Sequence, residues 1–339
     1  MNDALALPEQ ALAAYLQAHV ADFRGPLRAT KFKGGQSNPT YLIEAASGNY
    51  VLRRKPPGKL LASAHAVDRE FRVLRALAPT DIPVAQPLHL CADDAVIGSM
   101  FYLMSYAPGP IYFDPSLPDL SAEIRAEHYT AVLDVLAKLA RLDVSSVGLA
   151  DYAKPGNYFA RQVARWSEQY RAAETERIEP MEALLAWLPN SVPADDGRVA
   201  LVHGDFRIDN LIWHSDVPSI STIVDWELST LGHPFSDIAY FCMALRLPRN
   251  PILPGLAGLD RAQLGIPDEA ELIERFAAAT ALDPRPHWNF LLAFQFFRLA
   301  AIAQGVLKRA LQGNASSEHA LQAGAMTRTI AGLGVAALG

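Results

Sequence analysis

Residues 199–210 read Val-Ala-Leu-Val-His-Gly-Asp-Phe-Arg-Ile-Asp-Asn. The four apolar residues at the start predict a short buried strand, and the polar run after them predicts a loop. Residues 221–227, Ser-Thr-Ile-Val-Asp-Trp-Glu, show a similar arrangement. A second short run that predicts a strand ends at Val224, and Asp225 follows it directly. Asp225 follows Asp205 by twenty positions. Polar residues therefore follow directly after two predicted strands, and we expect the side chains of these residues to lie close together.

This pattern has the residue types that phosphoryl transfer requires. The reaction needs a carboxylate near the attacking hydroxyl and oxygen ligands for Mg²⁺. The catalytic loop of protein kinases has an Asp with an Asn five residues later, and Asp205 and Asn210 have this spacing. We predict that Asp205 orients the acceptor hydroxyl and takes its proton, and that Asn210 and Asp225 bind Mg²⁺. For either motif alone, an aspartate that caps a turn or a helix is an equal explanation. The two motifs in this order favour the chemical interpretation.

The sequence resembles the aminoglycoside phosphotransferase and choline kinase superfamily. Its members carry His-Gly-Asp-x-x-x-x-Asn followed by an Asp-Trp-Glu-like element, which correspond here to residues 203–210 and 225–227. The resemblance implies a protein-kinase-like two-lobed α+β fold. It also implies that Asp205 is the catalytic base, that Asn210 and Asp225 bind metal, that ATP and Mg²⁺ are the cofactors, and that the acceptor is a small-molecule alcohol.

A finer resemblance concerns residues 32–41, 50–59 and 63–70. With residues 201–240, they look like the branch found as the kinase-like domain fused to acyl-CoA dehydrogenases. This branch implies a hydroxyacyl-CoA or hydroxy acid as acceptor.

The acceptor class predicts the charge around it. An anionic acyl-CoA would favour nearby basic residues such as Arg54, Lys55 or Lys59, whereas a polycationic aminoglycoside needs an acidic pocket. An aminoglycoside kinase, another small-alcohol kinase acting on choline or a sugar, and a catalytically silent nucleotide-binding module remain the alternatives.

The expected organisation is a small lobe over residues 1–107 and a larger, mainly helical lobe over residues 108–339. The small lobe should hold a leading helix at 8–20, an antiparallel sheet with one hairpin, and a helix at about 64–77. The expected strands of this sheet include 40–43, 50–52, 88–90 and 101–104. Helical periodicity in the second lobe covers 158–170, 269–279 and 287–311, and a further apolar stripe begins at Tyr129.

The small lobe also holds the candidate nucleotide-binding residues. Small and amide residues between two strands allow phosphates to approach the backbone, as in the run Gly34, Gly35, Gln36, Ser37 and Asn38. The run matches neither the Walker spacing nor the protein-kinase glycine spacing, and a plain turn is the alternative.

An ion pair is the second candidate nucleotide contact. Glu70 lies on the apolar stripe of its predicted helix and needs a partner, because an unpaired buried carboxylate is costly. We assign Arg53, which stands where protein kinases carry a lysine, with Arg54 and Lys55 as substitutes. By resemblance, Met104 and Tyr106 belong to the connector whose backbone contacts adenine.

Three further residues lie in or near the central motif. Asp237 is interpreted as a structural carboxylate that holds the loop. His203 is expected to pack beneath the loop and bond to its backbone. Arg207 is a candidate catalytic residue, although it could also brace the loop.

Composition bounds the remaining functions. The net charge of −6 and the isoelectric point near 5.9 predict no general attraction to nucleic acid or to an anionic membrane. The two cysteines, Cys91 and Cys242, lack metal-ligand spacing and predict buried thiols. With no signal-like N-terminus and no membrane-length apolar run, we expect a cytoplasmic protein. The oligomeric state stays open.

Overall fold

The computed structural model describes residues 6–32, 38–56, 66–154, 156–313 and 320–338. The chain divides into two compact units. The first comprises Met1–Pro110, Ile212–His214 and Ser221–Glu227, and the second comprises Ile111–Leu211, Ser215–Ile220 and Leu228–Gly339. This division differs from the expected continuous split at residue 107, because two short segments return to the first unit. Asp225 therefore belongs to the first unit and Asp205 to the second.

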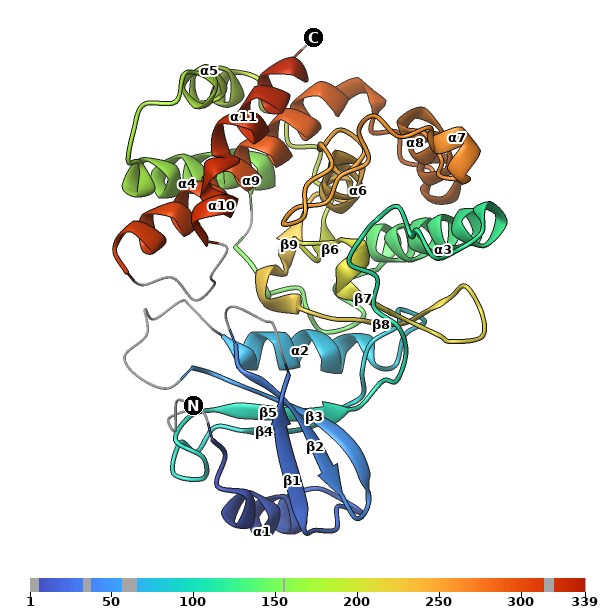
Figure 1. Ribbon diagram of the computed structural model, residues 1–339, viewed down its shortest axis with the longest axis vertical. Coiled ribbons are helices and arrows are strands. Elements are labelled where there is room, and N and C mark those ends of the chain that lie inside the picture. Colours follow the sequence, from blue (N-terminus) through green and yellow to red (C-terminus); the bar gives the residue numbers. More distant parts are fainter. Residues whose placement is uncertain (1–5, 33–37, 57–65, 155, 314–319, 339) are drawn as a thin grey trace. The chain divides into compact units, whose positions relative to one another are not determined.

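The first unit is built on a five-stranded antiparallel sheet with the order β1-β2-β3-β5-β4 (Figure 1). Its strands are β1 (Leu27–Lys31), β2 (Thr40–Ala45), β3 (Gly48–Arg54), β4 (Pro87–Cys91) and β5 (Phe101–Ser105). The expected hairpin joins β2 to β3, and Ala45 lies opposite Gly48. Gly48 has a φ of +131°, a backbone conformation that favours glycine. The expected antiparallel sheet is confirmed.

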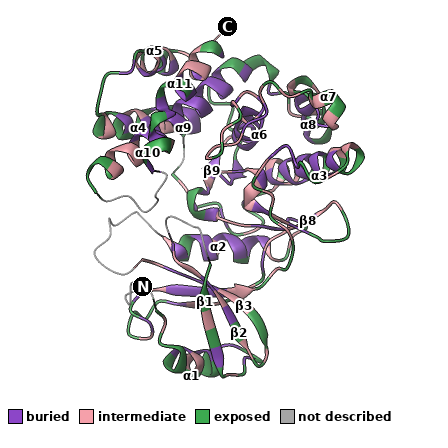
Figure 2. Cartoon of the chain, in the orientation of Figure 1, coloured by how far each residue is buried: buried purple, intermediate pink, exposed green. Residues whose placement is uncertain are grey.

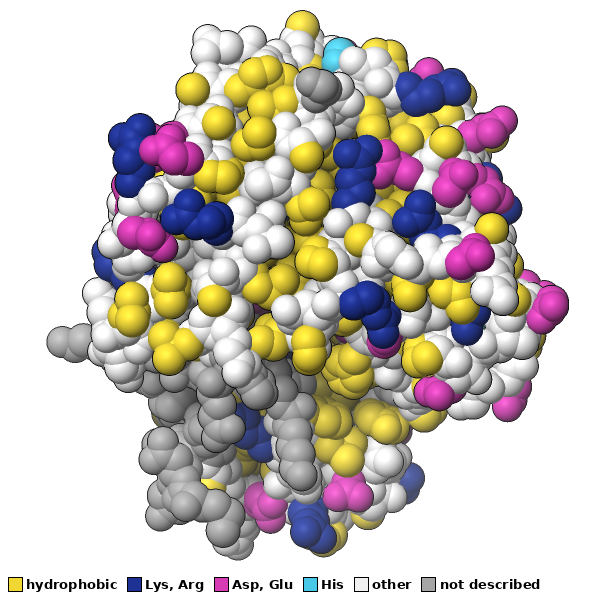
Figure 3. All heavy atoms as spheres, turned by 45° about the horizontal axis from the view of Figure 1, so that its top comes forward, with side chains coloured by type: hydrophobic (Ala, Val, Ile, Leu, Met, Phe, Trp, Pro, Cys, Tyr) yellow, Lys and Arg dark blue, Asp and Glu magenta, His cyan; other side chains and the backbone are white. Residues whose placement is uncertain are grey.

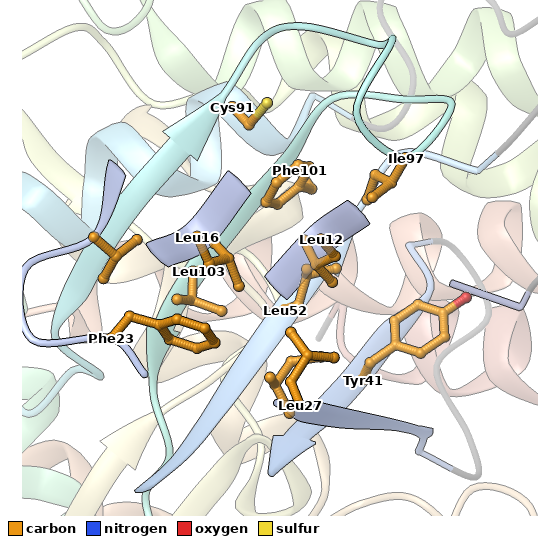
Figure 4. Packing of buried hydrophobic residues seen from close by; sticks show 12 residues of the cluster. Leu12, Leu16, Phe23, Leu27, Tyr41, Leu52, Cys91, Ile97, Phe101 and Leu103 are labelled. Atoms are coloured by element: carbon orange, nitrogen blue, oxygen red, sulfur yellow. The ribbon is translucent and has the colours of Figure 1, made fainter. Parts of the chain in front are cut away.

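One helix packs on each face of this sheet. Helix α1 (Glu9–His19) contributes Leu12 and Leu16, both fully buried, to an apolar cluster with Leu52 and Leu103 (Figure 4). Side chains alternate between the two faces of a strand, so the next residues along β3 and β5 lie on the opposite face. That face receives α2 (Val67–Leu77), whose Glu70 contacts them.

The second unit is mainly helical. Its helices are α3 (Ala122–Arg141), α4 (Tyr158–Ala173), α5 (Glu179–Trp187), α6 (Phe235–Met243), α7 (Arg261–Leu264), α8 (Glu269–Thr280), α9 (Trp288–Leu311), α10 (Ala320–Ala325) and α11 (Thr327–Ala336). The predicted helices are present as α3, α4, α8 and α9. Figure 2 shows that α6 and α9 are buried along most of their lengths.

The segment from residue 285 to residue 311, which contains α9, is long and apolar enough to cross a membrane by length and composition. However, 78% of its most apolar window is buried inside the protein, as in the core helix of a globular fold. This apolarity is therefore explained by packing.

Two short ladders carry the central motifs. Strand β6 (Ala200–Val202) pairs with β9 (Thr230–Gly232), and β7 (Leu211–Trp213) pairs with β8 (Ile220–Ile223). The sequence predicts β6 and β8. It does not predict β7 and β9, which are short strands that follow the polar residues of the two motifs.

Charges are mixed on the face of the helical unit drawn in Figure 3. Lysine and arginine side chains alternate there with aspartate and glutamate instead of gathering into one basic field. This face gives no support to binding of nucleic acid through its phosphates.

Candidate active site

The loop that begins at His203 follows β6 directly and closes with a 3-10 turn at Ile208–Asn210. Gly204 has a φ of +85°, and a Cβ there would lie 2.7 Å from the carbonyl oxygen of Leu228. A side chain at this position would therefore clash with backbone, so the turn requires glycine immediately before Asp205.

Asp237, in the first turn of α6, holds this loop by its backbone. Its carboxylate is 5% exposed and accepts hydrogen bonds from the amides of His203 at 2.7 Å and Gly204 at 2.9 Å. Burial raises the pKa of the Asp237 carboxyl, and His203 and the two amides oppose this shift. The predicted structural role of Asp237 is confirmed. His203 is fully buried and accepts a bond from the Asp205 amide at 3.2 Å, which also agrees with its prediction.

Asp205 receives hydrogen bonds on both carboxylate oxygens. The Tyr240 hydroxyl donates to Oδ1 at 2.6 Å, and the Asn210 amide nitrogen donates to Oδ2 at 3.1 Å. Burial disfavours the charged carboxylate, but Arg207, the Tyr240 hydroxyl and the charges of His203 and Arg298 outweigh it and lower its pKa. Asp205 is thus held in the ionised form that a proton acceptor requires.

The side chain of Arg207 is occupied within the loop. Its Nε donates to Asp209 Oδ1 at 2.8 Å, and its Nη2 pairs with the other oxygen of Asp209. Burial acts to lower the pKa of Arg207, but Asp209 and Asp205 raise it overall. This geometry braces the loop, and contact of Arg207 with a substrate remains a prediction.

In the first unit, Arg53 faces three carboxylates. Its Nε lies 2.8 Å from Glu70, and its Nη2 lies 2.7 Å from Asp225 and 3.4 Å from Glu227. The predicted pair with Glu70 is therefore present, and an ion pair of Arg53 with the predicted metal ligand accompanies it. Arg53 thus joins Glu70, Asp225 and Glu227 in one cluster of charged side chains within the first unit.

Glu70 is almost completely buried, with 2% of its surface exposed. Asn38 donates to its Oε1 at 2.8 Å, and the Tyr102 hydroxyl donates to its Oε2 at 3.2 Å. Asn38, a predicted nucleotide contact, thus supports Glu70 in this structure. The other predicted residues of its run, Gly34, Gly35, Gln36 and Ser37, lie outside the described residues.

Burial raises the pKa of Glu70 from 4.5 to about 7, and the neighbouring Asp225 and Glu227 also raise it, while Arg53 and Asn38 lower it. Since the folded pKa exceeds the unfolded one, the folded state binds more protons between these two values. We therefore expect the free energy of unfolding to fall as pH rises through this window. Glu70→Gln should flatten the slope in urea titrations at several pH values, whereas the exposed Glu44→Gln should not. Equal slopes for wild type and Glu70→Gln would contradict the assignment.

Asp225 has an unusual backbone. Its φ is +64°, a left-handed conformation that is uncommon for residues other than glycine, and a 3-10 turn follows at Trp226–Leu228. Residues held in such conformations are concentrated at functional sites. A third of the Asp225 side chain is exposed even with Arg53 bound to it.

The predicted adenine connector follows the end of β5. Met104 lies opposite Val51 of β3, and Tyr106, which follows the strand, is 37% exposed. These positions are compatible with backbone contacts to a base, which stay a prediction.

Each of the two units holds one side chain of a type that can bind Mg²⁺. Asn210 offers its amide oxygen, because its amide nitrogen already donates to Asp205, and Asp225 offers a carboxylate. Within the described ranges, no group of three or more His, Cys, Asp and Glu side chains could hold a metal ion. Such a group is not required, because Mg²⁺ at phosphates uses one or two carboxylates and keeps several waters.

Of two residues near Asp205, the sequence pattern misses Tyr240 and offers Arg298 only as a candidate for the wall of an acceptor site. Tyr240 lies on α6 and Arg298 lies on α9. The sequence around each of them indicates only an apolar helix. Phe294 and Phe297, the other two candidates for this wall on the helical segment at 287–311, are fully buried, as the alternative of core packing predicts. The sequence contains no local signal that separates these roles, because all four residues lie on core helices.

Comparison with known proteins places this geometry in a family. The model of a phosphotransferase enzyme family matches residues 28–264. Acyl-CoA dehydrogenase family member 10 of Mus musculus is 48% identical over 331 residues, which are 97% of this chain and 31% of that protein. The chain thus spans about a third of the length of this relative.

Two solved structures extend the comparison. A Ralstonia eutropha protein provisionally described as an aminoglycoside phosphotransferase is 43% identical, with a TM-score of 0.89 over 98% of both chains. Spectinomycin phosphotransferase APH(9)-Ia, solved with ADP and spectinomycin, is 12% identical, with a TM-score of 0.61 over 97% of this chain and 98% of its own.

These similarities first define the class, a protein with the α+β fold of protein kinases. The chain belongs to the phosphotransferase enzyme family. The predicted resemblance to the branch that includes acyl-CoA dehydrogenase family members is confirmed, over about a third of the length of member 10.

Proposed function

We propose that this protein transfers the γ-phosphoryl group of ATP to a hydroxyl group of a small molecule. In this reaction a bond forms between the acceptor oxygen and the γ-phosphorus, and the bond from that phosphorus to the bridging oxygen breaks to release ADP. The proton of the acceptor hydroxyl passes to the Asp205 carboxylate. The observation that carries the proposal is the geometry of Asp205, whose two carboxylate oxygens each accept a hydrogen bond in the Asp-x-x-x-x-Asn loop.

The same proposal assigns the nucleotide contacts. Asn210 and Asp225 are the proposed ligands of Mg²⁺, which when bound neutralises charge on the phosphates. Arg53 is proposed to contact the phosphates in place of the lysine of protein kinases. The ion pair of Arg53 with Asp225 and the left-handed backbone of Asp225 support these roles.

For the acceptor we propose a hydroxyacyl-CoA or a free hydroxy acid. The support is the high identity, over nearly the whole chain, to a protein named as an acyl-CoA dehydrogenase family member. Among the basic residues expected near an anionic acceptor, Arg54 is excluded, because it is 2% exposed and donates to Ser99. Lys55 remains partly exposed beside Asp68, and Lys59 lies outside the described residues.

The test is ADP formation from Mg-ATP with a panel of hydroxyacyl-CoAs, hydroxy acids, choline, sugars and aminoglycosides. We expect hydroxyacyl-CoA or hydroxy acid to stimulate ADP formation and to gain phosphate, as measured by mass spectrometry. Stimulation by an aminoglycoside alone would refute the acceptor assignment and retain the kinase. ATP binding without stimulation by any acceptor would favour the silent nucleotide-binding module.

A further inference from the structure

The Asp205 carboxylate is held by two groups of different origin. Asn210 belongs to the same loop and lies five residues away in sequence. Tyr240 belongs to α6, 35 residues further along the chain, and its 2.6 Å bond is the shorter of the two. A hydroxyl that donates to a carboxylate at this distance forms a strong, charge-assisted hydrogen bond.

The Tyr240 ring is itself fixed in place. It is 3% exposed, and the guanidinium of Arg298 lies 5.3 Å from its ring centroid. Nη2 of Arg298 also donates to the carbonyl oxygen of Gly204, the residue before Asp205. One buried arginine on α9 therefore contacts both the tyrosine and the loop that the tyrosine bonds.

Helix α6 contacts the loop at two points. Asp237 accepts the backbone amides of His203 and Gly204, and Tyr240, three residues later, donates to the Asp205 side chain. Residues three apart lie on one face of a helix, so a single face of α6 fixes both the backbone and the carboxylate.

We propose that Tyr240 is a positioning residue for phosphotransfer, whose hydroxyl fixes the rotation of the Asp205 carboxylate relative to the acceptor hydroxyl. The terminal torsion of aspartate has a broad energy profile, so a carboxylate bonded on one oxygen alone keeps rotational freedom. Bonds on both oxygens define its plane. Each oxygen has two lone pairs, so either can still accept from the substrate. This inference rests on the proposed function.

The alternative is a purely structural role, in which the Asp205 carboxylate only serves as the hydrogen-bond acceptor that the buried Tyr240 hydroxyl needs. The two roles differ in what Tyr240→Phe changes. Phenylalanine keeps the ring and its packing against Arg298 and removes one hydroxyl. Positioning predicts a lower kcat with little change in the KM for Mg-ATP, because the Tyr240 hydroxyl bonds Asp205 and not the proposed nucleotide contacts. A structural role predicts lower stability with unchanged kcat.

The experiment compares Tyr240→Phe with Tyr158→Phe, using the acceptor that stimulates the wild type. Tyr158 is a matched control, because it is also buried and its hydroxyl bonds the Ser236 hydroxyl at 3.1 Å. We expect kcat to fall about tenfold or more in Tyr240→Phe and to stay within about twofold in Tyr158→Phe. The KM for Mg-ATP should stay within about twofold in both. Urea unfolding of both variants gives their stabilities.

A double variant isolates the route of the effect. If Tyr240 acts through Asp205, adding Tyr240→Phe to Asp205→Asn should lower kcat little further. Equal kcat in Tyr240→Phe and Tyr158→Phe, or a full further loss in the double variant, would overturn the inference and leave the kinase intact. A wild type that phosphorylates no acceptor would instead overturn the proposed function, and the inference with it.

Discussion

Asp205→Asn should lower kcat for phosphotransfer by about two to four orders of magnitude, the usual contribution of a general base. An amide cannot take the proton of the acceptor hydroxyl. Its oxygen can still accept from Tyr240, and although its NH2 group cannot accept from Asn210, the Asn210 amide keeps its bond to the backbone carbonyl of residue 205, so the loop should keep its conformation. We therefore expect the dissociation constant for Mg-ATP to change little. Initial rates of ADP formation and equilibrium titration with a nucleotide analogue measure the two quantities.

Asp216→Asn is the matched control for that substitution. Asp216 is an exposed aspartate in the turn between β7 and β8, and its replacement removes the same charge from the chain. We expect wild-type kcat for it. If Asp205→Asn kept more than about a tenth of the wild-type kcat, Asp205 would not be the base.

Asp237→Ala should lower the free energy of unfolding by about 2–6 kcal/mol, because each of two buried amides that lose their acceptor costs about 1–3 kcal/mol. The substitution leaves the amides of His203 and Gly204 buried without their acceptor. Because these amides belong to the two residues immediately before Asp205, kcat should fall as well. Urea unfolding at neutral pH measures the stability, and ADP formation measures kcat.

Asp268→Ala provides the comparison. Asp268 also accepts a backbone amide, that of Glu271 at 2.8 Å, but it caps α8 in an exposed position. Loss of such a cap costs about 1 kcal/mol. If the two variants lost similar amounts of unfolding free energy, burial of Asp237 would add nothing to the stability that its hydrogen bonds contribute.

The chemistry of the site could be predicted from sequence because it depends on local spacing. The interval from Asp205 to Asn210 is set by one loop, and the apolar run before each motif identifies the strand that presents it. The Arg53–Glu70 pair could also be predicted, because a carboxylate on the apolar stripe of a helix requires a cation.

Other features depend on chain segments that meet only in the folded protein. The bond from Tyr240 to Asp205, the contact of Arg298 with Gly204 and the ion pair of Arg53 with Asp225 link residues 35, 94 and 172 positions apart. None of these three contacts can be predicted from the hydrophobic periodicity of the sequence.

By itself, the sequence determined the class of fold, the positions of most strands and helices, and the loop that carries Asp205. Each of these features can be predicted from the spacing of residue types over a short stretch of chain. Only the tertiary structure decided how the Asp205 carboxylate is held. It assigned Tyr240 to the Asp205 carboxylate, placed Arg298 beside both, and returned residues 221–227 to the first unit. The physical reason is that packing brings together segments that are far apart in the sequence. A local pattern of apolar residues indicates that a residue is buried, but it does not indicate which distant residue it contacts.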